Sequence, residues 1–120
     1  MSVNLPKQWL DRAAEDLVVA QLLLEEEHFA HACFLSQQGV EKGLKSFLLY
    51  STGAYPRTHR LVDLLAECMA SDHSLGQFLS DCAIVDQFYI PTRYPDSIPG
   101  GLASGLPGKT EAKEAVEIAS

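Results

Sequence analysis

The sequence has no long hydrophobic run and no excess of basic residues. No apolar stretch approaches the roughly 18 residues of a membrane-spanning helix, and the amino end lacks the apolar core of a secretory signal. We therefore expect a soluble, cytoplasmic protein that does not bind a membrane. With 9 Lys and Arg against 16 Asp and Glu, the net charge of −7 argues against a broad nucleic-acid-binding surface. A local basic pocket for a single nucleotide is still compatible with this balance.

Cysteine is scarce, and no metal-binding spacing is present. The three cysteines, Cys33, Cys68 and Cys82, form no Cys-x-x-Cys pair, which excludes a zinc knuckle or a dithiol redox centre. Each lies among apolar residues at helical spacing, so we expect small buried thiols in a reducing compartment. The four histidines are scattered without an acid at ligand spacing, so we expect neither a metal nor a cofactor. Three of them are expected at the surface near helix ends: His28, His31 and His73.

Strand signals are absent as well, and the periodicity is helical. Apolar residues recur at three- and four-residue steps, which predict helices over about 6–25, 29–50, 59–70 and 75–89 and a short last helix capped by Thr110. This order predicts an all-α fold, an up-and-down antiparallel four-helix bundle with a short fifth C-terminal helix. Because 47% of the residues are apolar, we expect a single domain over 1–120 with one packed core. Residues 97–108, rich in Pro and Gly, are expected to form a loop.

Several residues carry local predictions within these helices. Thr58 is expected to cap the third helix, and Phe78 and Leu79 to lie on the inner face of the fourth. Gly39 and Gly43 lie four apart on one side of the second helix. They indicate either close approach of another helix or mere tolerance of two weak helix formers.

A cluster of polar residues interrupts the apolar pattern of the second predicted helix. Gln37, Glu41 and Lys45 are four apart and share one row, and Gln38 and Lys42 form a neighbouring row. Burying such groups without partners costs several kcal/mol, so they need partners elsewhere in the fold.

A second polar cluster, Arg93-Tyr94-Pro95-Asp96, follows the fourth predicted helix, and we expect the two clusters to meet and form the site. In a functional interpretation, Lys42, Lys45 and Arg93 bind phosphate oxygens while the amides read a base or ribose. Tyr94 would stack on the base.

A structural interpretation of the same residues is also open, and the two can coexist. In it, Glu41 pairs with Arg93 or Lys45, and Gln37 holds the backbone of the long loop. Asp96 turns the chain or pairs with Arg93.

His59 follows the predicted cap of the third helix and has two interpretations of its own. It contacts phosphate at the helix N-terminus, where backbone N–H groups favour anions, or it packs its ring on the bundle and caps a carbonyl.

Several short motifs follow one another along the chain: Ala13-x-x-Asp16-Leu17, Ala32-Cys33-Phe34, Gln37-Gln38-x-x-Glu41-Lys42-x-x-Lys45, Thr58-His59-x-Leu61, Tyr89 and Arg93-Tyr94-Pro95-Asp96. In this order they resemble the HEPN domain, an all-helical family named partly for nucleotide binding. The resemblance covers about residues 5–118. No single motif is specific, but the ordered set is fairly specific.

The resemblance implies a helical bundle that forms a homodimer and works beside a minimal nucleotidyltransferase in a toxin–antitoxin-like pair. Many family members are metal-independent ribonucleases with an Arg, four to six intervening residues and a His. No Arg of this sequence has a His at that distance: Arg57 is too close to His59, and Arg93 has no His after it. The departure favours a binding module over an enzyme.

We therefore expect a HEPN-like module that binds a nucleotide or a partner, and two alternatives stay open. One is a metal-independent ribonuclease toxin that uses Arg93 and His59, and the other is a plain dimerisation module. The expected binding residues are Gln37, Gln38, Glu41, Lys42, Lys45, His59, Arg93, Tyr94 and Asp96.

Overall fold

The computed structural model describes residues 4–88 and 108–119, and every regular element in them is helical. This confirms the predicted all-α class. The elements are α1 (Leu5–Glu25), α2 (Phe29–Thr52), α3 (Leu61–Met69), the 3-10 helix η1 (His73–Phe78), α4 (Leu79–Asp86) and α5 (Lys109–Ala119). None of these helices is long and apolar enough to cross a membrane.

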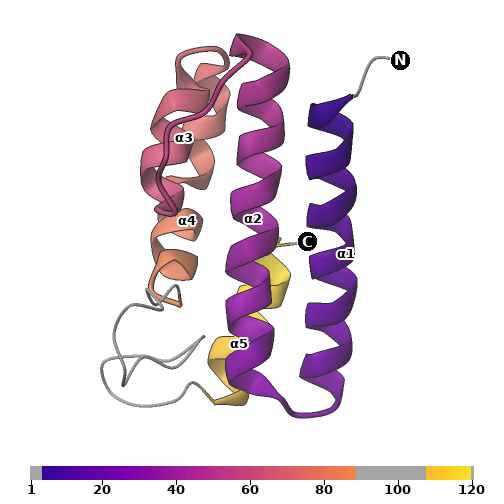
Figure 1. The fold of residues 1–120 in the computed structure, drawn as a ribbon. Coiled ribbons are helices and arrows are strands. Elements are labelled where there is room, and N and C mark those ends of the chain that lie inside the picture. The colour runs from indigo at the N-terminus through magenta and orange to yellow at the C-terminus, as the bar shows by residue number, and fades with distance from the viewer. Residues whose placement is uncertain (1–3, 89–107, 120) are drawn as a thin grey trace.

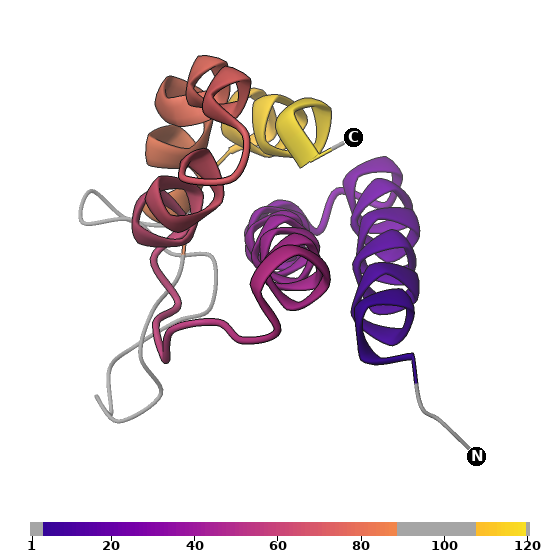
Figure 2. The same cartoon turned by 90° about the horizontal axis from the view of Figure 1, so that it is seen from above.

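The two long helices, α1 and α2, form an antiparallel pair, and α3, α4 and α5 also pack against α2 (Figure 1). Seen from above, α2 lies in the middle, with α1 on one side and α3 and α4 on the other (Figure 2). Helix α5 packs against both α1 and α2. Helices therefore pack against α2 from several sides, and Gln37, Glu41 and Lys45 at its centre are buried.

The predicted long helices are confirmed with small shifts at their ends. Asn4 caps α1 by accepting a hydrogen bond from the Lys7 backbone N–H, and Pro6 occupies its first turn. Helix α2 ends at Gly53, whose φ of 82° is the left-handed conformation that glycine adopts without strain. Close approach of another helix is confirmed at Gly39 alone, where an added Cβ would lie 3.4 Å from the Ala13 carbonyl oxygen of α1.

The predictions for the third, fourth and fifth helices need correction. Helix α3 begins at Leu61 with Arg60 at its N-cap, so Thr58 does not cap it, and α5 begins before Thr110. The predicted helix over 75–89 is a 3-10 helix followed by the short α4. Because this break turns the segment, Phe78 and Leu79 are each 44% exposed instead of facing inward.

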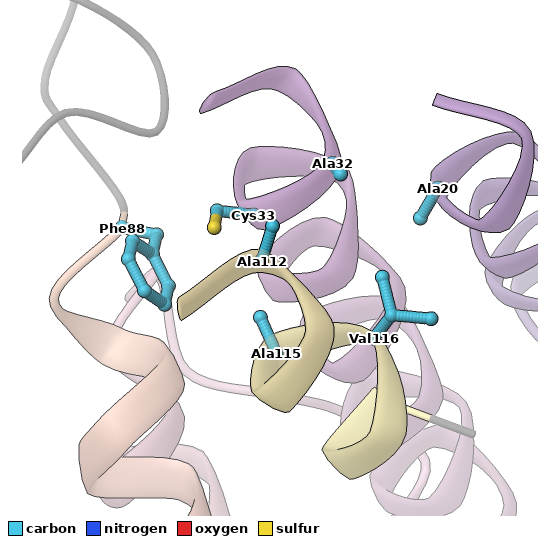
Figure 3. Packing of buried hydrophobic residues seen from close by; sticks show 7 residues of the cluster. All are labelled: Ala20, Ala32, Cys33, Phe88, Ala112, Ala115 and Val116. Atoms are coloured by element: carbon cyan, nitrogen blue, oxygen red, sulfur yellow. The ribbon is translucent and has the colours of Figure 1, made fainter. Parts of the chain in front are cut away.

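The core between α2, α4 and α5 is built largely from small side chains around one ring. Phe88, Cys33 and Ala112 lie close together where the end of α4 meets α2 and α5 (Figure 3). Burial raises the pKa of the Cys33 thiol from 9.0 to about 12, with a smaller effect of the Glu111 charge. All three cysteines are buried and unpaired, as predicted.

Candidate functional site

The row of Gln37, Glu41 and Lys45 forms a buried polar network in the middle of α2. Lys45 Nζ donates a hydrogen bond to Glu41 Oε2 at 2.8 Å, and the side chains of this ion pair are only 8% and 5% exposed. Gln37 is fully buried, and its Nε2 donates to Glu41 Oε1 at 3.3 Å and to the His59 carbonyl at 3.0 Å. The spacing of the row thus brings its polar groups into contact with one another.

Aromatic rings enclose the buried ammonium group of Lys45. Its Nζ lies 5.2 Å from the centre of the Tyr55 ring and 5.8 Å from that of the Trp9 ring. The two rings meet edge to face, with centroids 5.8 Å apart. Cation–π attraction from both rings compensates part of the desolvation of the charge. Neither ring was predicted to belong to the site, because they come from α1 and the 53–60 connection and the sequence has no signal for their meeting.

His59 connects this network to the molecular surface. Its Nδ1 lies 3.1 Å from Glu41 Oε2 and 3.2 Å from Oε1, and its side chain is 54% exposed. Its carbonyl oxygen accepts the hydrogen bond from Gln37. Both the backbone and the ring of His59 are therefore fixed by α2. With Gln38, which bonds to Gln37, the structure brings together five of the predicted residues: Gln37, Gln38, Glu41, Lys45 and His59.

The neighbouring row of α2, Gln38 and Lys42, contacts α1 through Lys42. Lys42 Nζ donates to Asp16 Oδ2 at 2.6 Å, in a pair whose side chains are 24% and 16% exposed. Gln38 Nε2 donates to Gln37 Oε1 at 2.7 Å, which connects the two rows. The polar cluster thus reaches two sides of the bundle, the His59 side and the α1 side.

A residue that the sequence analysis missed, Asp86, shapes the His59 side. Its carboxylate accepts hydrogen bonds from the backbone N–H groups of Leu61 at 2.6 Å and Val62 at 3.1 Å. The end of α4 therefore caps the start of α3, and these two N–H groups are engaged by protein. These two N–H groups at the start of α3 are therefore not available to bind an anion.

The network satisfies its own hydrogen-bonding requirements. Within residues 4–88 and 108–119, no buried side-chain nitrogen or oxygen lacks a hydrogen-bond partner. The structural interpretation thus holds for Glu41 and Lys45, and Gln37 holds the 53–60 connection. The same part of the chain contains no group of three or more His, Cys, Asp or Glu that could hold a metal ion.

The second predicted cluster cannot be compared with this network. Arg93, Tyr94 and Asp96 lie outside the described residues, as does the loop 97–108 up to residue 107. The expected meeting of the two clusters stays a prediction.

Comparison with known proteins assigns the fold to a family. The HEPN domain model matches residues 6–120. This chain belongs to the HEPN domain family. The resemblance inferred from the ordered motifs is therefore confirmed.

Three relatives place the chain among HEPN proteins along almost its whole length. It is 28% identical over 98% of its length to the candidate toxin MJ1304 of Methanocaldococcus jannaschii, of which it covers 83%. The crystal structure of TT1696 from Thermus thermophilus is similar with a TM-score of 0.78 and 33% identity, covering 98% of this chain and 91% of that one. ST0689, an archaeal HEPN homologue, gives a TM-score of 0.72 and 29% identity, covering 95% and 88% of the two chains.

Proposed function

We propose that this HEPN protein is the helical half of a toxin–antitoxin-like pair, in which it binds a nucleotide and a minimal nucleotidyltransferase. Membership of the family and the similarity to a protein named as a candidate toxin support the toxin-like part. The binding part rests on the polar cluster of α2, which reaches the surface at His59 and at Lys42.

The observation that carries the proposal is the buried Glu41–Lys45 pair that fixes His59. A buried ion pair seldom adds stability over well-packed apolar residues, because desolvation of the charges offsets their attraction. Its presence at the centre of α2 is therefore better explained by what it positions. Here it orients a half-exposed imidazole and the backbone beside it.

Co-expression tests the partnership. The tagged protein should retain the nucleotidyltransferase encoded in the same genome, and His59→Ala should reduce the amount retained. His31→Ala is the matched control, because it removes an exposed histidine of α2 far from Glu41. Equal retention by both variants, or none by the wild type, contradicts the proposal.

Calorimetric titration tests the nucleotide. We expect saturable heat with ATP, GTP or their mono- and diphosphates, for the protein alone or with its partner. Absence of heat in every combination contradicts nucleotide binding.

The contact between Glu41 and His59 also favours a second candidate, a metal-independent ribonuclease toxin. A carboxylate at Nδ1 holds the imidazole in one orientation, which suits a general base that removes a proton from a ribose 2′-hydroxyl. Arg93 would stabilise the negative charge on phosphate. This candidate predicts cleavage of bulk RNA in EDTA and its loss in Arg93→Ala and His59→Ala. Intact RNA, with no growth arrest on expression, would exclude it.

A further inference from the structure

The α1 side of the polar cluster contains a hollow beside Lys42. It has a volume of about 400 Å³ and is lined by Leu5, Gln8, Trp9, Arg12 and Lys42. The four α1 residues recur at three- and four-residue steps and so form one face of that helix, while Lys42 comes from α2. Its volume lies in the range of small-molecule sites.

The charged side chains that line this hollow are basic in an acidic protein, although the Asp16 carboxylate, 2.6 Å from Lys42 Nζ, offsets part of their charge. Two of its five lining residues are cationic and none is acidic, in a chain with a net charge of −7. Asp16 holds the Lys42 ammonium from the α1 side, so the position of that ammonium is fixed. Such a pair of cations, a fixed ammonium and a planar guanidinium, is suited to phosphate oxygens.

Trp9 adds an aromatic wall to the same hollow. Its ring also contacts Tyr55 edge to face and lies 5.8 Å from the Lys45 ammonium, so it belongs both to the buried network and to the lining of the hollow. A half-buried indole with a fixed orientation is a platform on which a nucleobase can stack.

We propose that this hollow binds a nucleoside phosphate, with its base on Trp9 and its phosphates between Arg12 and Lys42. This inference rests on the nucleotide binding proposed above and locates it on the α1 side, using two residues that were not among the expected ones. A mononucleotide fits better than an RNA strand, because a strand needs a continued basic track and the acidic composition argues against one.

Trp9 is the only tryptophan in the chain, so its fluorescence reports directly on the hollow. Titration with AMP, ADP, ATP and GTP should change the emission saturably for at least one of them. Adenosine should bind at least ten-fold more weakly than the phosphorylated ligand, and inorganic phosphate should leave the emission nearly unchanged. Higher salt should weaken binding, because the contacts are ionic.

Arg12→Gln should lower the affinity at least ten-fold, as measured by calorimetry. Lys7→Gln is the matched control: it removes the same charge from the same helix, but Lys7 pairs with the exposed Asp11 and does not line the hollow. Trp9→Phe should retain weaker binding. A thermal melt of each variant shows whether the fold is intact.

The outcomes separate this inference from the proposed function. If Arg12→Gln binds the nucleotide as tightly as the wild type, the site is not this hollow, but the protein still binds a nucleotide. No binding by the wild type, alone or with its partner, overturns both. Binding of a short oligonucleotide but of no mononucleotide overturns the ligand class.

Discussion

At the scale of the residue, Glu41 is the acceptor on which the polar network depends. Its two carboxylate oxygens accept hydrogen bonds from Lys45 and Gln37 and contact Nδ1 of the His59 ring. With the acid removed, Lys45 would be left as a buried charge between two aromatic rings.

Glu41→Gln should therefore lower the free energy of unfolding by about 3–5 kcal/mol, because breaking a buried pair leaves an uncompensated charge. Asp11→Asn, which breaks the exposed pair with Lys7, should cost less than about 1 kcal/mol. Urea unfolding of both variants measures the difference, and equal midpoints would show that the buried pair is unimportant for stability.

The buried thiols predict an alkaline loss of stability. Burial raises the pKa of Cys33 from 9.0 to about 12 and those of Cys68 and Cys82 to about 11, with smaller effects of neighbouring charges. Above about pH 9 the unfolded chain releases thiol protons that the folded chain retains, so stability falls as the pH rises toward 11. The urea midpoint should fall less between pH 8 and pH 10 when all three cysteines are replaced by alanine. An equal fall would contradict the prediction.

The sequence could predict the network only in part. The spacing of Gln37, Glu41 and Lys45 placed them on one row, because helical geometry fixes which residues are neighbours. The partners from outside α2 depend on tertiary packing: His59 lies 18 residues from Glu41, and Trp9 is on another helix. No local pattern encodes such contacts.

At the scale of the element, the long helices were predictable, and so were α3 and α5 apart from their ends, whereas the division of the predicted helix over 75–89 into η1 and α4 was not. Apolar residues at helical spacing over more than five turns define α1 and α2 almost by themselves. Between α3 and α4, the chain tightens into η1, where Asp72 accepts hydrogen bonds from the Ser74 backbone and hydroxyl. Gly76 then approaches Met69 so closely that an added Cβ would lie 3.0 Å from its Cε. This turn depends on packing against α3, which periodicity cannot show.

The two glycines of α2 give a matched test of helix packing. Gly43→Ala should raise the free energy of unfolding by about 0.5–1 kcal/mol, because its Cβ meets nothing within 4 Å and alanine favours the helix. Gly39→Ala should raise the free energy of unfolding by less, or lower it, because its Cβ would press on the α1 backbone at Ala13. Urea unfolding compares them, and equal gains would mean that α1 moves away without cost.

At the scale of the whole molecule, one face of the bundle leaves apolar side chains exposed. Leu10, Ala14, Val18 and Leu22 form an exposed row along α1 at four-residue steps. Leu10 and Ala14 also line an apolar groove of about 610 Å³ that extends over Gly43 to Phe78. Contiguous apolar surface of this kind commonly marks an interface.

We propose that a second copy of the chain covers this face, which makes the protein a homodimer. Sedimentation velocity should give about twice the 13.1 kDa monomer mass. Leu10→Glu should reduce the measured mass to that of the monomer. Leu79→Glu, at an exposed leucine that does not line the groove, should leave the mass of the dimer unchanged. A wild-type protein that stays monomeric at all concentrations contradicts the dimer.

The 53–60 connection, finally, combines exposure with firm attachment. It presents Arg57 and Arg60 to solvent, yet Gln37 holds the His59 carbonyl and the Thr58 hydroxyl accepts a hydrogen bond from the Arg60 N–H. Trypsin cleaves only a segment that can leave the surface and extend into the active-site cleft of the protease. The peptide bonds after Arg57 and Arg60 should therefore resist digestion in the native protein. The rate of cutting there then measures how often the segment detaches, and Glu41→Gln should accelerate it.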